Sequence, residues 1–547
     1  MKAHAVVAVV ILLIGGIAAL LVTLTRWPTI HLLPADQFYL LLTTHGVNML
    51  IFWMISFEIA ILYFCSSTLL KVRLATPRIA WFAFALMLAG IIINNVAVFS
   101  GTASVMMTSY VPMPANPNFY LGLILFAVGA LIGCFIFLAT LVIAKDEKTY
   151  EGSIPLVTFG ALTACIIAVF TIASGAIVLV PTWLWSLGYI NNIDAAMYRI
   201  VWWALGHSSQ QINVAAHVAV WYAIAAIVFG ARPLSEKVSR TAFFLYIAFL
   251  QLASAHHLLV DPGLSAEWKI FNTSYAMYLA VLASMVHGLT VPGSIEVAQR
   301  AKGYTNGLFQ WLRKAPWGNP IFTGMFISLV GFGFLGGISG VVMGTEQINI
   351  IIHNTIYVPG HFHATVVIGS TLAFMSLTYF LIPTLFRKQV AFPGIAKLQP
   401  YFFGIGMSVF ALAMMGAGTL GVERRHWDMA FTNAPLDFAY PASAYTMMGI
   451  MGVAGMVAII GGAMFILVTV VSVFFGKPVG SESSYGVATT RVLRADPIVV
   501  PEGGHEAAGK WGFAAPGTFV LAIFFLVTFV LYYAVNWKYL ASVWPMS

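Results

Sequence analysis

Two histidines separated by a single residue, His361 and His363, lie in a strongly apolar part of the chain. On a helix, residues two apart point about 200° away from each other, so these imidazoles face opposite sides and cannot readily share one metal ion. Imidazole is a frequent axial ligand of haem iron. The pair therefore predicts two separate centres, with this helix wedged between two haems and one histidine bound to each iron.

A second pair, His256 and His257, ends another apolar run just before the helix-breaking segment 261–263. Adjacent helix residues point about 100° apart, so both rings can hold one ion from neighbouring directions if a third ligand completes the site. His207, near the start of the run 197–230, is the candidate for that third ligand. Three neutral imidazoles with an open coordination position suit copper, iron or zinc in a reactive site.

Among the other histidines and the cysteines, only His45 is predicted here to bind a metal. His45 enters from the same side of the membrane as the other ligands and is the candidate for the second axial ligand of one haem. Tails or loops are expected to hold His4, His31, His426 and His505. The three cysteines fall within apolar runs, so we expect them in the core, as neither disulfides nor a thiolate cluster: Cys65, Cys134 and Cys165.

The elements that carry these histidines are those of a membrane protein. Of the 547 residues, 60% are hydrophobic and 8% are charged, which is too apolar for a soluble globular domain. A spanning helix needs about 20 mostly apolar residues, and such runs follow one another along the chain. We predict an all-α, polytopic membrane protein with thirteen transmembrane helices, at about residues 5–25, 38–66, 80–100, 119–143, 154–181, 197–230, 240–258, 270–291, 320–343, 353–386, 399–420, 443–475 and 513–536.

The net charge of +8 reflects membrane topology rather than a nucleic-acid partner. If the N-terminus is cytoplasmic, only six basic residues lie outside, which leaves 20 of the 26 Lys and Arg on the cytoplasmic side. The six are Arg26, Arg199, Lys269, Arg424, Arg425 and Lys538. This bias predicts a cytoplasmic N-terminus and an external C-terminus. We expect residues 1–547 to form one integral-membrane catalytic domain, in which 476–510 is a cytoplasmic loop.

The ligand candidates belong to longer segments that resemble a known family. These segments are His45-Gly46-Val47, Trp202-Trp203 through Gly206-His207, His256-His257 with Asp261-Pro262-Gly263, Trp268-Lys269, His353-Asn354 through Pro359-Gly360-His361-Phe362-His363, and Arg424-Arg425. With them, nearly the whole chain resembles subunit I of the haem-copper oxidases, most closely the B-type oxygen reductases.

The resemblance implies three metal centres and the residues that bind them. A low-spin haem, expected to be of type b, would be bound by His45 and His363, and a high-spin haem by His361. Copper, with iron as the alternative, would be held by His207, His256 and His257. Arg424, Arg425 and His353 would lie at the haem propionates, since guanidinium groups pair strongly with carboxylates.

The resemblance also implies partners and a location. The chain itself lacks a soluble cytochrome or cupredoxin domain, so electrons would come from a subunit II-like protein, with or without a dinuclear copper centre, or from cytochrome c. The enzyme would act on a small gas molecule within a prokaryotic cytoplasmic (inner) membrane.

One position departs from the oxygen reductases. In B-type enzymes, a tyrosine four residues after the first copper ligand is cross-linked to that ligand and supplies an electron and a proton for O–O cleavage. Here that position is Gln211, one helical turn from His207, and Gln cannot form a stable radical. Another oxidase class supplies the tyrosine six residues before the paired histidines, where this chain has Leu250; Tyr246 lies one turn further away. Joining two NO molecules needs only two electrons, so this pattern favours nitric oxide reduction.

The proton route is expected to be modified as well. Val286 and Leu289 occupy positions where B-type oxidases place hydroxyl groups. Polar residues that remain as candidates for a proton path are Tyr222, Ser284, His287 and Thr290, together with Glu58, the carboxylate near the middle of a predicted span. Reduction of O2 to water is the runner-up function, and a proton or metal transporter is the alternative from another class.

Overall fold

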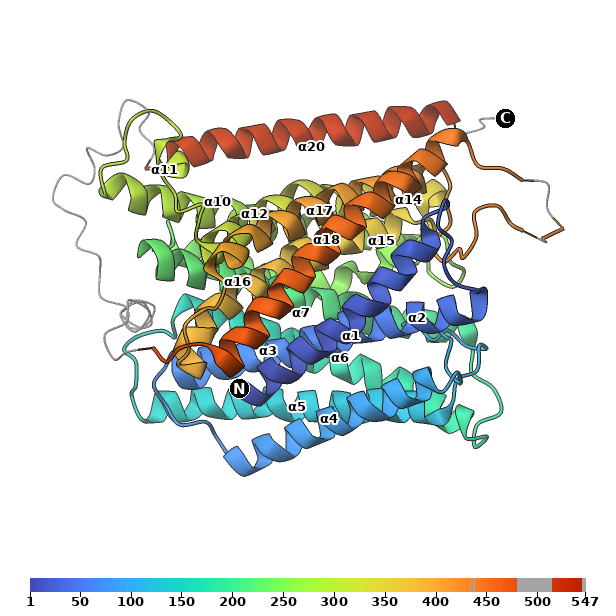
Figure 1. The fold of residues 1–547 in the computed structure, drawn as a ribbon, viewed down its shortest axis with the longest axis horizontal. Coiled ribbons are helices and arrows are strands. Elements are labelled where there is room, and N and C mark those ends of the chain that lie inside the picture. Colours follow the sequence, from blue (N-terminus) through green and yellow to red (C-terminus); the bar gives the residue numbers. More distant parts are fainter. Residues whose placement is uncertain (433, 436–437, 480–513, 544–547) are drawn as a thin grey trace.

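The computed structural model describes residues 1–432, 434–435, 438–479 and 514–543, and within these it leaves out the side chains of 250, 251, 253, 255, 540, 541 and 543. Helices dominate the described chain, and its only β-type pairing consists of two isolated bridges, Thr355 with Glu423 and Lys388 with Pro478. The all-α prediction is therefore confirmed. The helices run side by side along the long axis of the molecule (Figure 1).

Twelve helices in the described part of the chain are long and apolar enough to cross a membrane. They are α1 (Lys2–Arg26), α2 to η2 (Ala35–Thr68), α4 (Pro77–Phe99), α5 (Pro117–Asp146), α6 (Leu156–Ser186), α7 (Ala195–Phe229), α9 to α10 (Ala266–Ala301), α12 to α13 (Pro320–Met343), α15 to η8 (Tyr357–Phe386), α17 (Pro393–Thr419), α18 (Ala442–Phe475) and α20 (Pro516–Val543). Each coincides with one predicted run.

The remaining predicted run, 240–258, is helical but not one regular helix. It consists of α8 (Glu236–Leu245), a π-helical segment (Tyr246–Leu250) and a 3₁₀ segment (Gln251–His257). Two contacts with α7 fix its course: Tyr222 donates to Ser239 at one end, and His207 bonds to His257 at the other. Tyr222 and His207 are fifteen residues apart, about 22 Å along α7.

This segment therefore also crosses the bundle, which makes thirteen crossings. With this odd number of crossings in the described part of the chain, the start of α1 and the end of α20 lie at opposite ends of the bundle (Figure 1).

π-Helical segments adjoin several of the candidate ligands. Asn48–Trp53 begins three residues after His45, and His363–Thr371 begins at a ligand itself. Phe332–Gly337 ends two residues before Ser339, which contacts His361. A π-turn within an α-helix often occurs at a functional site, because it changes which side chains face a given neighbour.

The structure corrects two placements. The run predicted to begin at residue 353 begins at Tyr357, because the short helix α14 (Glu346–Ile352) ends just before His353 and Asn354 takes a left-handed conformation with φ of 57°. His4 is not in a tail: it lies within α1, is 3% exposed, and meets Tyr63 and Phe84 edge-on.

His426 and His31 are in loops, as expected, and His505 lies outside the described residues. His426 is also buried, and its Nδ1 lies 2.6 Å from the carbonyl of Glu423. The three cysteines are buried, which confirms that they lie in the core.

Candidate metal and haem sites

Three histidines from two helical segments meet at one point. His207 projects from α7, and His256 and His257 end the 3₁₀ segment. One ring nitrogen from each lies within 4.8 Å of the other two. His207 Nδ1 and His257 Nε2 are 3.0 Å apart, which corresponds to an angle of about 95° at an ion bound at about 2 Å from both. The donor set therefore fits a metal ion such as copper.

Two aromatic rings pack against His257, one of the three ligands of this cluster. Trp203 stacks on the His257 ring with centroids 3.8 Å apart and planes 10° apart, and Phe362 lies parallel to the same ring at 5.6 Å. The side-chain amide of Asn349 donates to the backbone carbonyl of His256 at 3.1 Å. These contacts of Trp203, Phe362 and Asn349 were not predicted from the sequence. The available signal was the position of Trp203, one helical turn before His207, from which its ring can reach a metal ligand.

His45 and His363 face each other across a gap. Their rings are nearly parallel, 15° apart, with centroids separated by 6.3 Å. Each Nδ1 donates to a backbone carbonyl, of Gly15 at 3.1 Å and of Pro359 at 2.7 Å, which leaves Nε2 with its lone pair. With metal–nitrogen bonds of about 2 Å and ring centroids about 1.1 Å further out, two imidazoles on one iron have centroids about 6 Å apart. The gap thus fits one haem iron.

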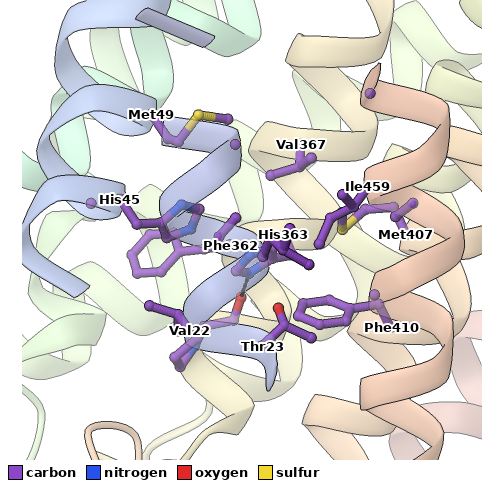
Figure 2. A pocket seen from close by; sticks show the side chains of 18 of the residues that line it. Val22, Thr23, His45, Met49, Phe362, His363, Val367, Met407, Phe410 and Ile459 are labelled. Carbon is purple, nitrogen blue, oxygen red and sulfur yellow. Dashed lines mark hydrogen bonds between the residues drawn. The ribbon is translucent and has the colours of Figure 1, made fainter. Parts of the chain in front are cut away.

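The two rings open into a cavity of about 400 Å³ between α1, α2, α15, α17 and α18. Figure 2 shows His45 and His363 projecting into it between apolar side chains that include Val22, Met407 and Phe410. An apolar cavity with two opposed imidazoles suits a flat, hydrophobic cofactor.

Three arginines line the cavity: Arg26, Arg424 and Arg425. None of the described residues that line it is an Asp or a Glu. Burial, and then the neighbouring Arg425, lower the pKa of the Arg424 guanidinium to about 10, which indicates a site where positive charge is poorly compensated. Two carboxylates of a bound haem would supply the missing negative charge.

Arg26 was not among the predicted site residues, because it ends an apolar run and was counted only as an external charge. Its guanidinium donates to the backbone carbonyl of Arg424 at 2.9 Å. The signal that could have identified it is a single arginine at the end of a span on the same side as the histidines.

The predicted propionate residue His353 makes other contacts. Its Nε2 lies 3.6 Å from Asp261, which also forms an ion pair with Arg199 at 2.7 Å. Burial raises the pKa of the Asp261 carboxyl, but the nearby His353 and the hydrogen bonds and positive charge of Arg199 outweigh this effect and lower the pKa below its ordinary value. His353 thus links the segment after His257 to Asn349, whose oxygen lies 3.2 Å from His353 Nδ1.

His361 points away from the cavity that holds His363. Its Nδ1 lies 2.9 Å from the hydroxyl of Ser339 on α13 (Ile338–Met343), and that hydroxyl donates to the carbonyl of Leu335. The serine therefore accepts from His361 Nδ1–H, and Nε2 keeps its lone pair. The expected division of His361 and His363 between two sides is present.

Three positions bear on the missing active-site tyrosine: Gln211, Leu250 and Tyr246. Gln211 is 1% exposed and one turn beyond His207 on α7. The side chain of Leu250 lies outside the described part of the chain. The Tyr246 hydroxyl bonds to Ser284 at 2.9 Å, and its ring packs at 5.4 Å from that of His287. Tyr246 is ten residues before His256, about 15 Å along a helix.

Apart from Glu58, which lies in the span Ala35–Thr68, the remaining proton-path candidates lie near the other end of α7. The Tyr222 hydroxyl lies 3.0 Å from both Ser239 Oγ and His287 Nδ1. His287 Nε2 is buried and has no hydrogen-bond partner among the described residues. Thr290 donates to the carbonyl of Val286 in its own helix at 2.6 Å.

Comparisons with known proteins agree with this arrangement. The sequence model of the family described as cytochrome c and quinol oxidase polypeptide I matches residues 1–464. Cytochrome c oxidase subunit 1 of Thermus thermophilus is 29% identical over 428 residues, 76% of this chain and 73% of the relative. Quinol oxidase subunit 1 of Bacillus spizizenii is 22% identical over 438 residues, 76% and 64% of the two chains.

A solved structure shares the fold. Described as the cryo-EM structure of a heme-copper terminal oxidase dimer, it superimposes with a TM-score of 0.83 and 26% identity, over 96% of this chain and 90% of that chain. The family match covers far more than half of the sequence, and the solved structure extends the likeness to almost all of it. The chain therefore belongs to the cytochrome c and quinol oxidase polypeptide I family, that is, to subunit I of the haem-copper oxidases.

Proposed function

We propose that this multi-pass oxidoreductase subunit reduces nitric oxide to nitrous oxide in preference to reducing O2. The observation that carries the proposal is Gln211, one turn after His207, where an amide replaces an oxidisable side chain. The reaction would take place between His361, as the ligand of a high-spin haem, and the metal held by His207, His256 and His257. A low-spin haem between His45 and His363 would feed it with electrons.

The electron balance supports this choice. Two NO, two electrons and two protons give N2O and water, whereas O2 needs four electrons and four protons to give two waters. When bound, the haem irons and the third metal supply one-electron chemistry and bind the gas. A site with one haem and one metal can provide two electrons by itself. Tyr246 is a poor source of a further electron, because its hydroxyl bonds to Ser284, about 15 Å along the helix from the paired histidines.

The donor set supports copper rather than iron at the third site. The cluster found among the described residues consists of three imidazoles and contains no carboxylate. Neutral imidazoles suit copper, and hard oxygen ligands would favour a more oxophilic metal.

We further propose that protons reach the site through the cluster around Tyr222. The order would be Ser239, Tyr222 and His287 of α10 (Met277–Ala301), with Ser284 of the same helix bonded to Tyr246 of the π-helical segment Tyr246–Leu250. Thr290 would have a structural role, since its hydroxyl bonds within its own helix.

Tyr222→Phe is expected to slow proton uptake during turnover about 100-fold, the loss typical of a positioned proton-transfer group. Stopped-flow measurement with a pH indicator dye would detect it. Tyr401→Phe is the matched control, because the Tyr401 hydroxyl only donates to the carbonyl of Trp317. Equal rates for both variants would contradict the proposed route.

The topology and the partners extend the proposal. A cytoplasmic N-terminus and an external C-terminus would put the arginine-lined end of the cavity on the outer side of a prokaryotic inner membrane, together with His256 and His257. Electrons would enter there from a subunit II-like protein, with or without dinuclear copper, or from cytochrome c. Among the related chains, some are named cytochrome c oxidase subunits and others quinol oxidase subunits.

The substrate test compares two gases on one enzyme. Purified complex supplied with reductant is expected to form N2O from NO much faster than it consumes O2, because the site lacks the side-chain electron that O2 cleavage uses. Gas chromatography of N2O and an oxygen electrode give the two rates. Fast O2 consumption to water without released peroxide, exceeding NO turnover, would overturn the proposal in favour of an oxygen reductase.

A further inference from the structure

Glu58 is a buried carboxyl group away from all the candidate ligands. It lies on α3 (Met54–Tyr63), is 5% exposed, and its Oε1 has no hydrogen-bond partner among the described residues. Burying a carboxyl group without a partner is costly, and ionisable residues within membrane spans usually have a functional role. Packing alone therefore does not account for a carboxyl group at position 58.

The Glu58 side chain lines a second cavity. This cavity, of about 80 Å³, lies between α3, α5, α6 and α7, and its wall on α7 includes Gly206 and Ser209. A water molecule needs about 15 Å³ of such volume, so several waters fit. The polar residues among those that line it are Glu58 on α3, Cys134 on α5, Thr171 on α6 and Ser209 on α7.

From Ser209, a polar chain continues around α7. The side-chain amide of Gln210 donates to Ser209 Oγ at 3.2 Å, and the amide of Asn213 donates to Gln210 Oε1 at 3.2 Å. Gln210 is three residues after His207, so the two side chains are neighbours on the helix surface. This chain connects the cavity side of α7 with the side that carries the metal ligand.

The next polar side chain between Glu58 and the end of this helix is Tyr63. Tyr63 is five residues further along the same span, and its buried hydroxyl also has no hydrogen-bond partner among the described residues. The ring of His4 on α1 meets Tyr63 at 5.8 Å. Two unpartnered polar groups thus follow one another between the end of this span and the cavity.

We propose that Glu58 is an internal proton donor for the reaction at the three-histidine site. Its carboxyl O–H bond breaks as a new O–H bond forms on water in the cavity. The Ser209 hydroxyl oxygen takes a proton from that water and releases its own proton towards the product oxygen, while the amide of Gln210, which donates to Ser209 Oγ, positions the hydroxyl. The carboxylate then regains a proton from water on the Tyr63 side. Cys134 on α5 is the ionisable group that faces Glu58, and the residues of α6 and α7 that line the cavity are uncharged.

The inference rests on the proposed function only in that the reaction consumes protons. Both NO and O2 reduction do so, and the inference therefore holds for either gas. It differs from the Tyr222 route because the two paths approach α7 from different helices. Each turnover consumes at least two protons, and each path delivers a separate one, so loss of either path slows the whole reaction.

The test is Glu58→Gln in the purified complex, which preserves size and removes the titrating proton. Proton uptake after mixing the reduced enzyme with NO, and separately with O2, should slow about 100-fold, while Glu58→Asp retains a larger part of the rate. The infrared difference spectrum between oxidised and reduced enzyme should lose a carboxylic acid C=O band in Glu58→Gln. Glu147→Gln is the matched control, because Glu147 is in an exposed ion pair with Arg73.

Wild-type proton uptake and an unchanged infrared band in a Glu58→Gln enzyme with both haems bound would overturn the inference. A failure of the proposed function would appear differently, as a preference of the wild-type enzyme for O2. If Glu58→Gln does not assemble, the Glu58→Asp enzyme decides, since a shifted carboxyl band is expected from it and an unshifted one would equally refute the donor role.

Discussion

Replacing His361 by alanine should remove the CO-reactive haem signal and leave the low-spin haem spectrum in place, whereas His45→Ala should do the reverse. The reason is that the two rings of the His361 and His363 pair serve different sides of one helix: His361 bonds to Ser339, and His363 opposes His45 across the cavity. Each variant removes an axial ligand from one iron only. Reduced-minus-oxidised and CO difference spectra of the purified variants measure both outcomes.

His4→Ala is a suitable control for these spectra, because His4 is a buried histidine of α1 that packs against Tyr63 and Phe84. It should retain both haem signals. Loss of the same absorption band in His361→Ala and His45→Ala would show that the two histidines serve one centre, and the assignment of ligands would be wrong.

His207→Ala should abolish turnover and lower the content of non-haem metal while both haems remain bound. Loss of an outer hydrogen-bond partner of a metal ligand costs about 10- to 100-fold in affinity or activity, so removal of a ligand should cost more than about 100-fold. The two remaining imidazoles cannot hold the ion tightly. Elemental analysis of copper and iron, set against haem content, measures the effect, and His256→Ala and His257→Ala should behave alike.

The control for this set is His217→Ala. His217 is buried on the same helix as His207, ten residues further on, but its Nδ1 bonds to Ser370 at 2.8 Å and it is not part of the three-histidine cluster. Metal content should be unchanged. A metal-to-haem ratio that is also unchanged in His207→Ala would rule out the three-histidine site.

Much of this architecture could be predicted because lipid imposes simple rules. A span needs about 20 apolar residues, and each of the thirteen runs became a helical crossing. Pairs of histidines were informative because helix periodicity fixes the angle between neighbouring side chains, as for His361 and His363. Family membership then set aside the transporter interpretation.

The features that could not be predicted depend on contacts between distant segments. The stacking of Trp203 on His257 and the bond from Arg26 to the backbone of Arg424 join residues 54 and 398 positions apart. The 3₁₀ geometry of the segment that ends in His256 and His257 also has no signature in its residue types. His4 was misplaced because a polar residue four positions from the N-terminus resembles a tail unless its aromatic neighbours are known.

The π-helical segments have a consequence for how the sequence of this protein can vary in length. A π-turn holds one residue more than an α-turn, so deleting one residue between His363 and Ser370 would be absorbed by a return to α-geometry, whereas a deletion from a regular α-helix rotates everything beyond it by about 100°. Ser370 would then keep its contact with His217, and Thr371 its contact with Trp53. Loss of a single residue should therefore be tolerated better within this span than in the regular helices around it, and alignments that place gaps inside it carry structural information.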